Sequence, residues 1–249
     1  MHAAGLYDSQ ERGTKTYEYV ASSYTPSLSI LADANIGLSR VPEPFKGVLA
    51  VSQPSMDGQT LIPNTVFEVE ALIKALDGTV PSQWLKGAQA TKEAVLSGME
   101  SSTWVHLACH ARQYPLRTSE SAFMLANGET LSLADISARV SADGELAFLS
   151  ACQTAAGDFD LSEEGVHLAA GMLVAGYRSV IATTWSVCDR DAPVVAELVY
   201  QRLLDGGQVN RTGTALALHH ATRFLREKLQ VEVGENQFMR WAPFVHLGI

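Results

Sequence analysis

Four short runs of apolar residues, each bounded by polar or turn-forming residues, recur along this chain of 249 residues. The runs cover residues 47–51, 103–109, 146–151 and 179–185. A continuous apolar run of this length is typical of a strand buried on both faces, as strands in parallel sheets are. Apolar residues at helical spacing fill residues 64–76, 91–99, 163–175, 192–204 and 212–229. This alternation predicts an α/β fold, with a mostly parallel central β-sheet flanked by helices on both faces.

The chain carries no convincing linker, internal repeat or low-complexity segment. A length near 250 residues suits one large α/β domain. We therefore predict a polar N-terminal lead over residues 1–18 and a single domain over residues 19–249. Further short β elements are predicted at residues 17–20, at residues 121–133 (a hairpin around Asn127-Gly128) and at residues 241–247.

Composition excludes several classes of protein. Acidic side chains outnumber basic ones by 27 to 18, for a net charge of −9, which argues against a nucleic-acid-binding protein and against binding to an anionic membrane. The three cysteines, Cys109, Cys152 and Cys188, form no disulfide framework or CxxC zinc site. The most apolar tract, residues 166–187, includes Arg178 and reads as a buried helix and strand rather than a membrane span. We expect a cytoplasmic protein.

No Walker lysine loop, GxGxxG or GxSxG motif occurs in the chain, so nucleotide chemistry and a serine nucleophile are disfavoured. His219 and His220 are adjacent on a predicted helix, where they point about 100° apart and cannot easily hold one metal ion. We therefore expect neither a metal nor another cofactor.

Two chemically active residues come directly after buried strands. His110 follows one predicted strand and Cys152 ends another, and ligands of parallel sheets bind beyond the carboxyl ends of the strands. A thiol becomes a strong nucleophile when an imidazole takes its proton. On spacing alone, a buried structural cysteine and a loop histidine are the favoured interpretation.

The residues around this pair resemble the CHAT domains, caspase-like cysteine peptidases of the caspase, metacaspase and separase group. The two central motifs are His106-Leu107-Ala108-Cys109-His110 and Leu149-Ser150-Ala151-Cys152-Gln153-Thr154. Further segments that resemble the family lie at residues 19–26, 120–123, 131–136, 164–176, 184–189 and 241–248. The similarity thus covers nearly the whole chain.

The resemblance implies a catalytic dyad, with Cys152 as nucleophile and His110 as general acid/base, and a backbone carbonyl that orients the imidazole. His106 is then a buried orienting or structural residue. The backbone N–H groups of Cys152 and of the residue after His110 form the oxyanion hole. The family usually has glycine at that second position, whereas this chain has Ala111. Its methyl group could obstruct the substrate, or the position could need a φ that alanine resists.

Substrate preference depends, in relatives of this fold, on the loops after the cysteine and after the next strand. Asp158 and Asp189 are the acidic residues there that could bind an Arg or Lys side chain. The alternatives are that Asp158 caps a loop turn and that Asp189 caps the helix starting near Ala192. Trp185 is either a wall of this pocket or a core residue.

The sequence therefore favours a cysteine endopeptidase that acts on a protein substrate, with cleavage after a basic residue as the expected preference. Because CHAT domains commonly adjoin repeat or signalling modules, the resemblance also implies control by a regulatory partner or repeat module in trans. The alternative is a catalytically silent interaction module in a signalling complex, which Ala111 would favour.

Overall fold

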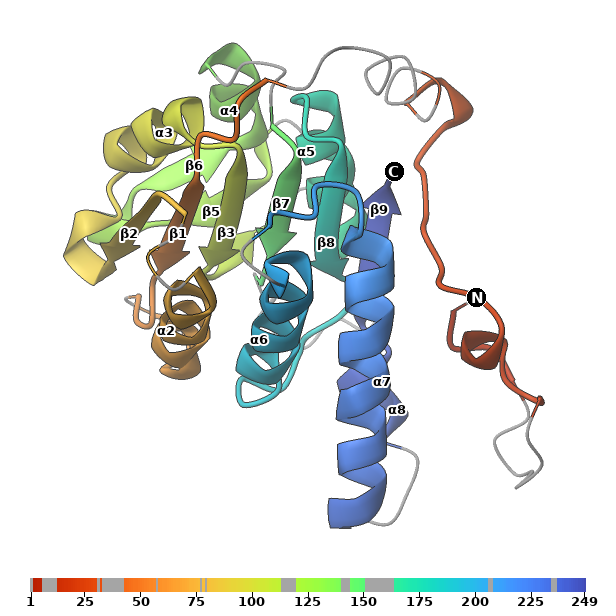
Figure 1. The fold of residues 1–249 in the computed structure, drawn as a ribbon. Helices are drawn as coiled ribbons and strands as arrows, with labels where there is room; N and C mark the ends of the chain where they lie inside the picture. Colours follow the sequence, from red (N-terminus) through yellow and green to blue (C-terminus); the bar gives the residue numbers. More distant parts are fainter. Residues whose placement is uncertain are drawn as a thin grey trace.

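The computed structural model describes residues 2–5, 13–30, 32, 43–56, 58–76, 78, 80–112, 120–139, 144–150, 164–205, 208–233 and 237–249 (Figure 1). A six-stranded sheet in the order β2-β1-β3-β7-β8-β9 forms their centre. Its strands are β1 (Val48–Ser52), β2 (Ser82–Lys86), β3 (Trp104–Ala108), β7 (Leu146–Leu149), β8 (Ser179–Thr183) and β9 (Phe244–Gly248). Neighbouring strands are parallel except β8 and β9, which are antiparallel. The prediction of a mostly parallel sheet is confirmed.

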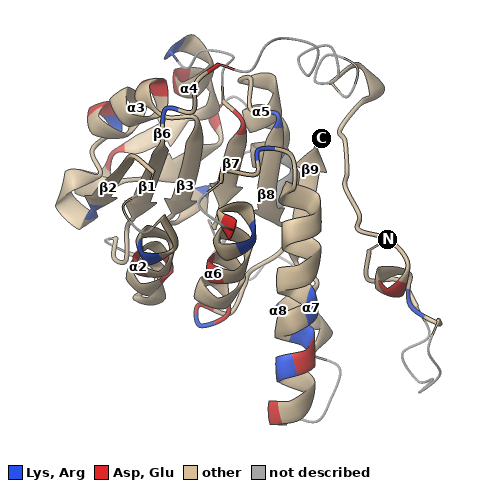
Figure 2. Ribbon diagram, in the orientation of Figure 1, with Lys and Arg blue, Asp and Glu red and all other residues tan. Residues whose placement is uncertain are grey.

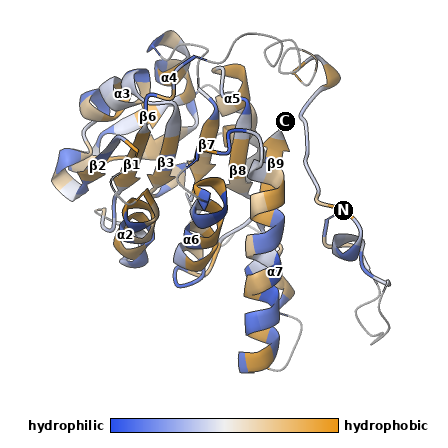
Figure 3. Ribbon diagram, viewed as in Figure 1, coloured by the Kyte–Doolittle hydropathy of each residue, from blue (hydrophilic) through white to orange (hydrophobic). Residues whose placement is uncertain are grey.

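Helices cover both faces of the sheet, as predicted. One face carries α2 (Asn64–Leu76), α6 (Ala192–Leu203) and α7 (Thr214–Val233), which lie side by side in Figure 1. The other face carries α3 (Lys92–Ser101), α4 (Leu133–Arg139) and α5 (Glu164–Val174). In Figure 3, hydrophobic and hydrophilic bands alternate along α7, as in a helix that buries one side only.

Side chains of each strand alternate between the two helical layers. Val105 and Leu107 of β3 pack into the core beneath α3, α4 and α5. Trp104 and Ala108 of the same strand pack into the core beneath α2, α6 and α7. The unbroken apolar run of β3 thus reflects burial on both sides.

A small antiparallel sheet extends the chain beyond β3. It contains β4 (Ala111–Arg112), β5 (Ala122–Met124) and β6 (Thr130–Ser132). The turn between β5 and β6 uses the left-handed conformation at Asn127, with φ of 58°, which asparagine tolerates better than most residues. The predicted hairpin around Asn127-Gly128 is confirmed.

The N-terminal segment packs along the β9 edge of the sheet. Tyr24 forms a parallel bridge with Leu247, and its N–H donates to the carbonyl of His246 at 2.9 Å. Within the predicted lead, the His2 ring lies 2.8 Å from the Tyr24 hydroxyl and 2.8 Å from the Ala242 carbonyl. The lead and the domain are therefore in direct contact.

Three local features differ from the prediction. Instead of a strand at residues 17–20 there is a 3-10 turn at Thr16–Glu18, because the Glu18 carboxylate accepts bonds from the N–H groups of Gly13 and Lys15. The last strand starts at Phe244 because α8 (Phe238–Trp241) precedes it. Strand β2 was not predicted, since at this exposed edge only Leu85 is buried and no apolar run forms.

Candidate active site

His110 lies at the edge of the sheet where β1, β3, β7 and β8 end, two residues beyond β3. Its side chain is buried, and its Nε2 lies 2.8 Å from the carbonyl oxygen of Thr60. Because a carbonyl only accepts hydrogen bonds, Nε2 must donate. In the neutral imidazole, a proton on Nε2 leaves the basic lone pair on Nδ1. This bond therefore orients the ring and, in the neutral form, places the proton on Nε2.

The loop between β1 and α2 brings Thr60 to this histidine. At its start, the N–H of Gln53 donates to the carbonyl of Ala108 at 2.9 Å, which ties the loop to the end of β3. Further along, the N–H of Ile62 donates back to the carbonyl of Pro54 at 3.0 Å. These bonds hold the loop against the end of β3, where the Thr60 carbonyl reaches the ring of His110.

The structure removes both objections to Ala111, namely obstruction of the substrate by its methyl group and a φ that alanine resists. Among the described residues only Asn127 is a non-glycine residue with positive φ, so the backbone at Ala111 is one that alanine adopts freely. Its methyl group is buried in the core beneath α3, α4 and α5. Met124 N–H donates to the His110 carbonyl, which makes Ala111 and Phe123 a non-hydrogen-bonded pair. The N–H of Ala111 therefore points away from β5.

Two predicted site residues, Cys152 and Asp158, lie outside the described residues. The described chain before Cys152 ends at Ser150, directly after β7. Ser150 is buried, and its Oγ donates to Oε2 of Glu68 at 3.0 Å. Since β7 pairs with β3, the segment that leads to Cys152 starts beside the segment that carries His110.

Asp189 contacts the start of α2 rather than the start of α6. Its Oδ2 accepts hydrogen bonds from the backbone N–H and the side-chain amide of Asn64, at 3.2 and 2.6 Å. A carboxylate at this position complements the helix dipole. The predicted cap on the helix near Ala192 is thereby corrected, because α6 follows Asp191 and the Asp191 carboxylate binds Arg240 at 2.7 Å. Asp189 itself is partly exposed.

Trp185, the other described candidate for substrate contact, lies against α8. Its Nε1 donates to the carbonyl of Met239 at 3.0 Å, and its ring stacks on Phe238 with 5.9 Å between centroids. The partly exposed ring also lines a mostly apolar groove of about 340 Å³ together with Tyr24 and Pro26. The structure therefore places Trp185 towards the β9 side of the sheet.

A buried polar cluster lies beneath this edge, and sequence reasoning missed most of it. His106 of β3 is buried, as predicted, with its Nδ1 3.1 Å from the hydroxyl of Tyr200 on α6. Its Nε2 lies 3.2 Å from Oε1 of Glu68, at an angle outside that of a hydrogen bond. Burial, and then the Glu68 carboxylate, raise the pKa of Tyr200 well above its usual value. The phenol therefore stays protonated, and its hydroxyl lies at hydrogen-bond distance from Nδ1 of His106.

A signal for Glu68 was present in the helical pattern. The buried side of α2 contains Thr65, Val69, Leu72 and Leu76, and Glu68 is a buried member of the same stripe. An acidic residue inside an apolar stripe indicates a buried carboxylate with a partner. The partner itself, Ser150, is 82 residues away in sequence and has no local signal.

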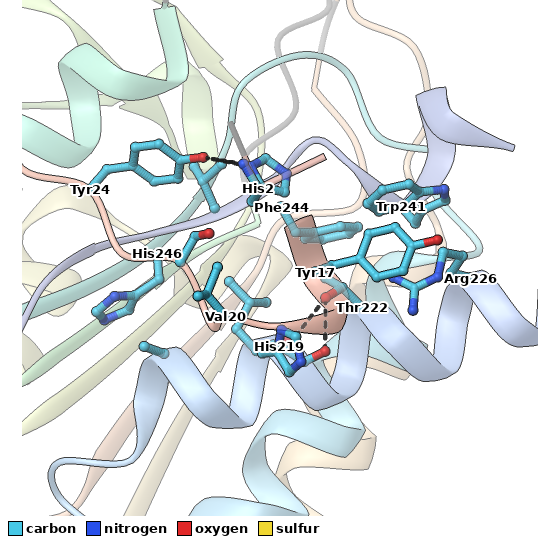
Figure 4. Close-up of a pocket in the computed structure, with 14 residues that line it drawn as sticks. His2, Tyr17, Val20, Tyr24, His219, Thr222, Arg226, Trp241, Phe244 and His246 are labelled. Carbon is cyan, nitrogen blue, oxygen red and sulfur yellow. Dashed lines mark hydrogen bonds between the residues drawn. The ribbon is translucent and has the colours of Figure 1, made fainter. Parts of the chain in front are cut away.

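The remaining candidate groups are structural. Burial raises the pKa of the Cys109 thiol to about 12, which keeps it protonated and unreactive. His219 lines a cavity of about 30 Å³ between the N-terminal segment, α7 and β9 (Figure 4), with room for little more than water. There the guanidinium of Arg226 lies 3.4 Å from the ring centroid of Tyr17. Within the described part of the chain, no group of three His, Cys, Asp or Glu side chains could hold a metal ion.

Figure 2 shows charges of both signs on the helices. Arg223 and Glu227 of α7 form an ion pair. None of the helices that the structure describes is long and apolar enough to cross a membrane.

The sheet order, the two helical layers and the histidine at the carboxyl edge define a caspase-like α/β protein with a cysteine peptidase-type fold. The chain belongs to the CHAT domain family, whose model matches residues 1–249. No curated protein matches it in sequence.

Solved structures support the same fold. A crystal structure of gingipain R, an Arg-specific cysteine proteinase, is 17% identical with a TM-score of 0.56, over 89% of this chain and 51% of the other. The pro- and mature domains of that proteinase from Porphyromonas gingivalis match at 14% identity with a TM-score of 0.60, over 89% and 52%. The separase–securin complex of Saccharomyces cerevisiae matches at 15% identity with a TM-score of 0.59, over 92% and 14%. The chain thus spans about half the length of the gingipain chains and 14% of the chain that it matches in the separase–securin complex.

Proposed function

We propose that this chain is a cysteine endopeptidase in which His110 and Cys152 form the catalytic dyad. The observation that carries the proposal is the bond from His110 Nε2 to the Thr60 carbonyl, which leaves Nδ1 as a base at the carboxyl edge of the sheet. Position 152 follows Ser150 by two residues, a reach of at most about 7 Å, from a strand that pairs with β3. Membership of the CHAT family supports the same assignment.

In this mechanism, His110 Nδ1 takes the proton of the Cys152 thiol, and the thiolate attacks the carbonyl carbon of the scissile peptide bond. The N–H groups of Ala111 and Cys152 stabilise the resulting oxyanion. The imidazolium of His110 then protonates the leaving amine as the C–N bond breaks. Water, deprotonated by His110, hydrolyses the thioester and restores the free thiol.

The conformation of Ala111 supports turnover over a silent interaction module. The methyl group packs into the core and the N–H points away from β5, so a backbone donor can serve the oxyanion hole without glycine. Ala111 in place of glycine therefore no longer favours a silent module.

Cleavage after a basic residue is the specificity that this proposal includes. The acidic groups for it are Asp189, which lies partly exposed at the carboxyl edge, and Asp158, with Trp185 as an apolar wall. Gingipain R, which shares the fold, is an Arg-specific proteinase. Control by a protein partner in trans also belongs to the proposal, since two structural neighbours were solved as complexes, one with a pro-domain and one with securin.

The test is cleavage of a positional peptide library by the wild type and by Cys152→Ala and His110→Ala. We expect both substitutions to lower kcat/KM by about 10⁴-fold or more, and the preferred residue before the cut to be Arg or Lys. Cys109→Ala and His219→Ala are matched controls that should retain activity. Activity that survives Cys152→Ala would overturn the dyad, and wild-type silence together with no labelling of Cys152 by an electrophilic peptide would favour the interaction module.

A further inference from the structure

The start of α2 and the loop before it contact the ends of three strands at the candidate active site. The contacts are Thr60 with His110 beyond β3, Asn64 with Asp189 beyond β8, and Glu68 with Ser150 beyond β7. The first contact orients the proposed base. The third acts on the strand that leads, two residues later, to the proposed nucleophile. One short segment of the chain therefore contacts both the proposed base, His110, and Ser150, which lies two residues before the proposed nucleophile.

A carboxylate is energetically unfavourable at the buried position of Glu68. Glu68 is 1% exposed, and the desolvation of a buried carboxylate destabilises the fold unless its partners compensate. An apolar side chain of similar volume would fill the α2 stripe between Thr65 and Leu72 without that cost. The carboxylate accepts a hydrogen bond from the Ser150 hydroxyl, which an apolar residue cannot do, and it also lies beside His106.

The geometry restrains the end of β7 from both sides. On one side, β7 pairs with β3 only as far as Leu149 opposite Leu107. Beyond that point, Ser150 is held through its side chain by Glu68, whose other carboxylate oxygen lies 3.2 Å from Nε2 of His106 on β3. The hydrogen bond from Ser150 to Glu68 thus restrains the chain directly after the pairing of β7 with β3 ends.

We propose that Glu68 is a positioning residue, which fixes Ser150 at the end of β7 and thereby the start of the segment that carries the proposed nucleophile. This inference rests on the proposed peptidase function. It assigns no chemical step to Glu68, because its contacts are with Ser150 and His106 rather than with substrate. A displacement of the nucleophile by about 1 Å can lower a rate by about 100-fold, so loss of this contact should be visible in kcat.

The test compares two buried serines of neighbouring strands. Ser150→Ala removes the hydroxyl that binds Glu68, whereas Ser179→Ala removes one that binds His246 at 2.7 Å at the opposite edge of the sheet. Both serines are buried, at 4% and 3% exposure, so both variants should lose similar stability. We expect Ser150→Ala to lower kcat about 10- to 100-fold with little change in KM, and Ser179→Ala to leave kcat within two-fold.

Two variants of Glu68 sharpen the assignment. Glu68→Gln keeps an oxygen that accepts from Ser150 and should retain more kcat than Glu68→Ala. For all variants, the rate of Cys152 alkylation by iodoacetamide is followed against pH, which needs no substrate. Ser150→Ala should shift the midpoint of this profile, because the thiol no longer sits at the same distance from His110.

The outcomes separate this proposal from the proposed function. Equal kcat and equal alkylation profiles for Ser150→Ala and Ser179→Ala would overturn the positioning role, even with an active wild type. An inactive wild type would overturn the peptidase function, and a Cys152 profile that still moves in Ser150→Ala alone would uphold positioning of the thiol. Where Glu68→Ala fails to fold, the Ser150 and Ser179 pair decides the question.

Discussion

The two faces of the central sheet bury different kinds of side chain. On the face beneath α3, α4 and α5, the buried residues of the described strands in this sheet are all apolar: Leu49, Val51, Leu85, Val105, Leu107, Ala147, Leu149, Val180, Ala182, Val245 and Leu247. On the face beneath α2, α6 and α7, the strands also bury polar groups, namely Ser52, His106, Ser179, Thr183 and His246. The same strands therefore provide a purely hydrophobic layer on one side and a polar one on the other.

This difference explains how one fold provides both stability and a site. The apolar face gains stability from burial alone, which is non-directional and tolerates changes of packing. The polar face depends on specific partners, such as Tyr200 for His106 and Glu68 for Ser150, because unpaired buried polar groups are costly. His110 and the start of α2 lie on this second face, where hydrogen bonds can fix orientation.

The largest effect is expected when one partner of the polar face is removed. His106→Leu leaves the Glu68 carboxylate buried without its imidazole neighbour, so we expect a loss of about 3–5 kcal/mol in the free energy of unfolding. Urea denaturation measures it. The double variant His106→Leu, Glu68→Met converts the cluster to the chemistry of the other face and should recover most of that loss. If His106→Leu were as stable as the wild type, His106 and Glu68 would not contribute to the stability of this face.

A smaller effect is expected from pH at His246. Burial lowers its pKa to about 4, against about 6.5 in the unfolded chain, because its two ring nitrogens face only the hydroxyls of Ser23 and Ser179. The unfolded state then binds more protons between these values, so this contribution is complete above pH 6.5 and is lost as the pH falls towards 4. At 1.36 kcal/mol per pKa unit, the loss is about 3 kcal/mol.

The measurement is the free energy of unfolding at several pH values for the wild type and His246→Gln. The variant lacks the titrating ring, so its stability should decline less between pH 6.5 and 4. Parallel curves for the two proteins would contradict the lowered pKa.

The smallest effect tests the apolar face. Val105→Thr is isosteric and places a hydroxyl where the neighbours are hydrophobic, which should cost about 1–3 kcal/mol of stability. The substitution should leave kcat unchanged, since Val105 points away from His110 and α2. Thermal and urea unfolding give the first quantity and peptide cleavage the second. An unchanged unfolding midpoint would mean that this face can satisfy polar groups after all.

Local patterns predicted the layers of the fold because burial on both faces leaves an unbroken apolar run, as in β3. They placed His110 at the edge of the sheet for the same reason. They did not reveal the Ser150–Glu68 and Asn64–Asp189 contacts, which join residues 82 and 125 positions apart and leave no periodic signal. Strand β2 was missed because an exposed edge imposes little on composition. Cys152 and Asp158 remain sequence predictions.

The contact between Ser23 and His246 has a consequence for the order of folding. It joins residues 223 positions apart, and the chain entropy lost on closing so long a loop is compensated only after the intervening sheet has formed. The bond therefore closes late, and its partial exposure makes it one of the first to open. Thermal fluctuations of the native protein should thus begin at the β9 edge, whereas β3 and β7 at the centre of the sheet stay ordered until the whole domain unfolds.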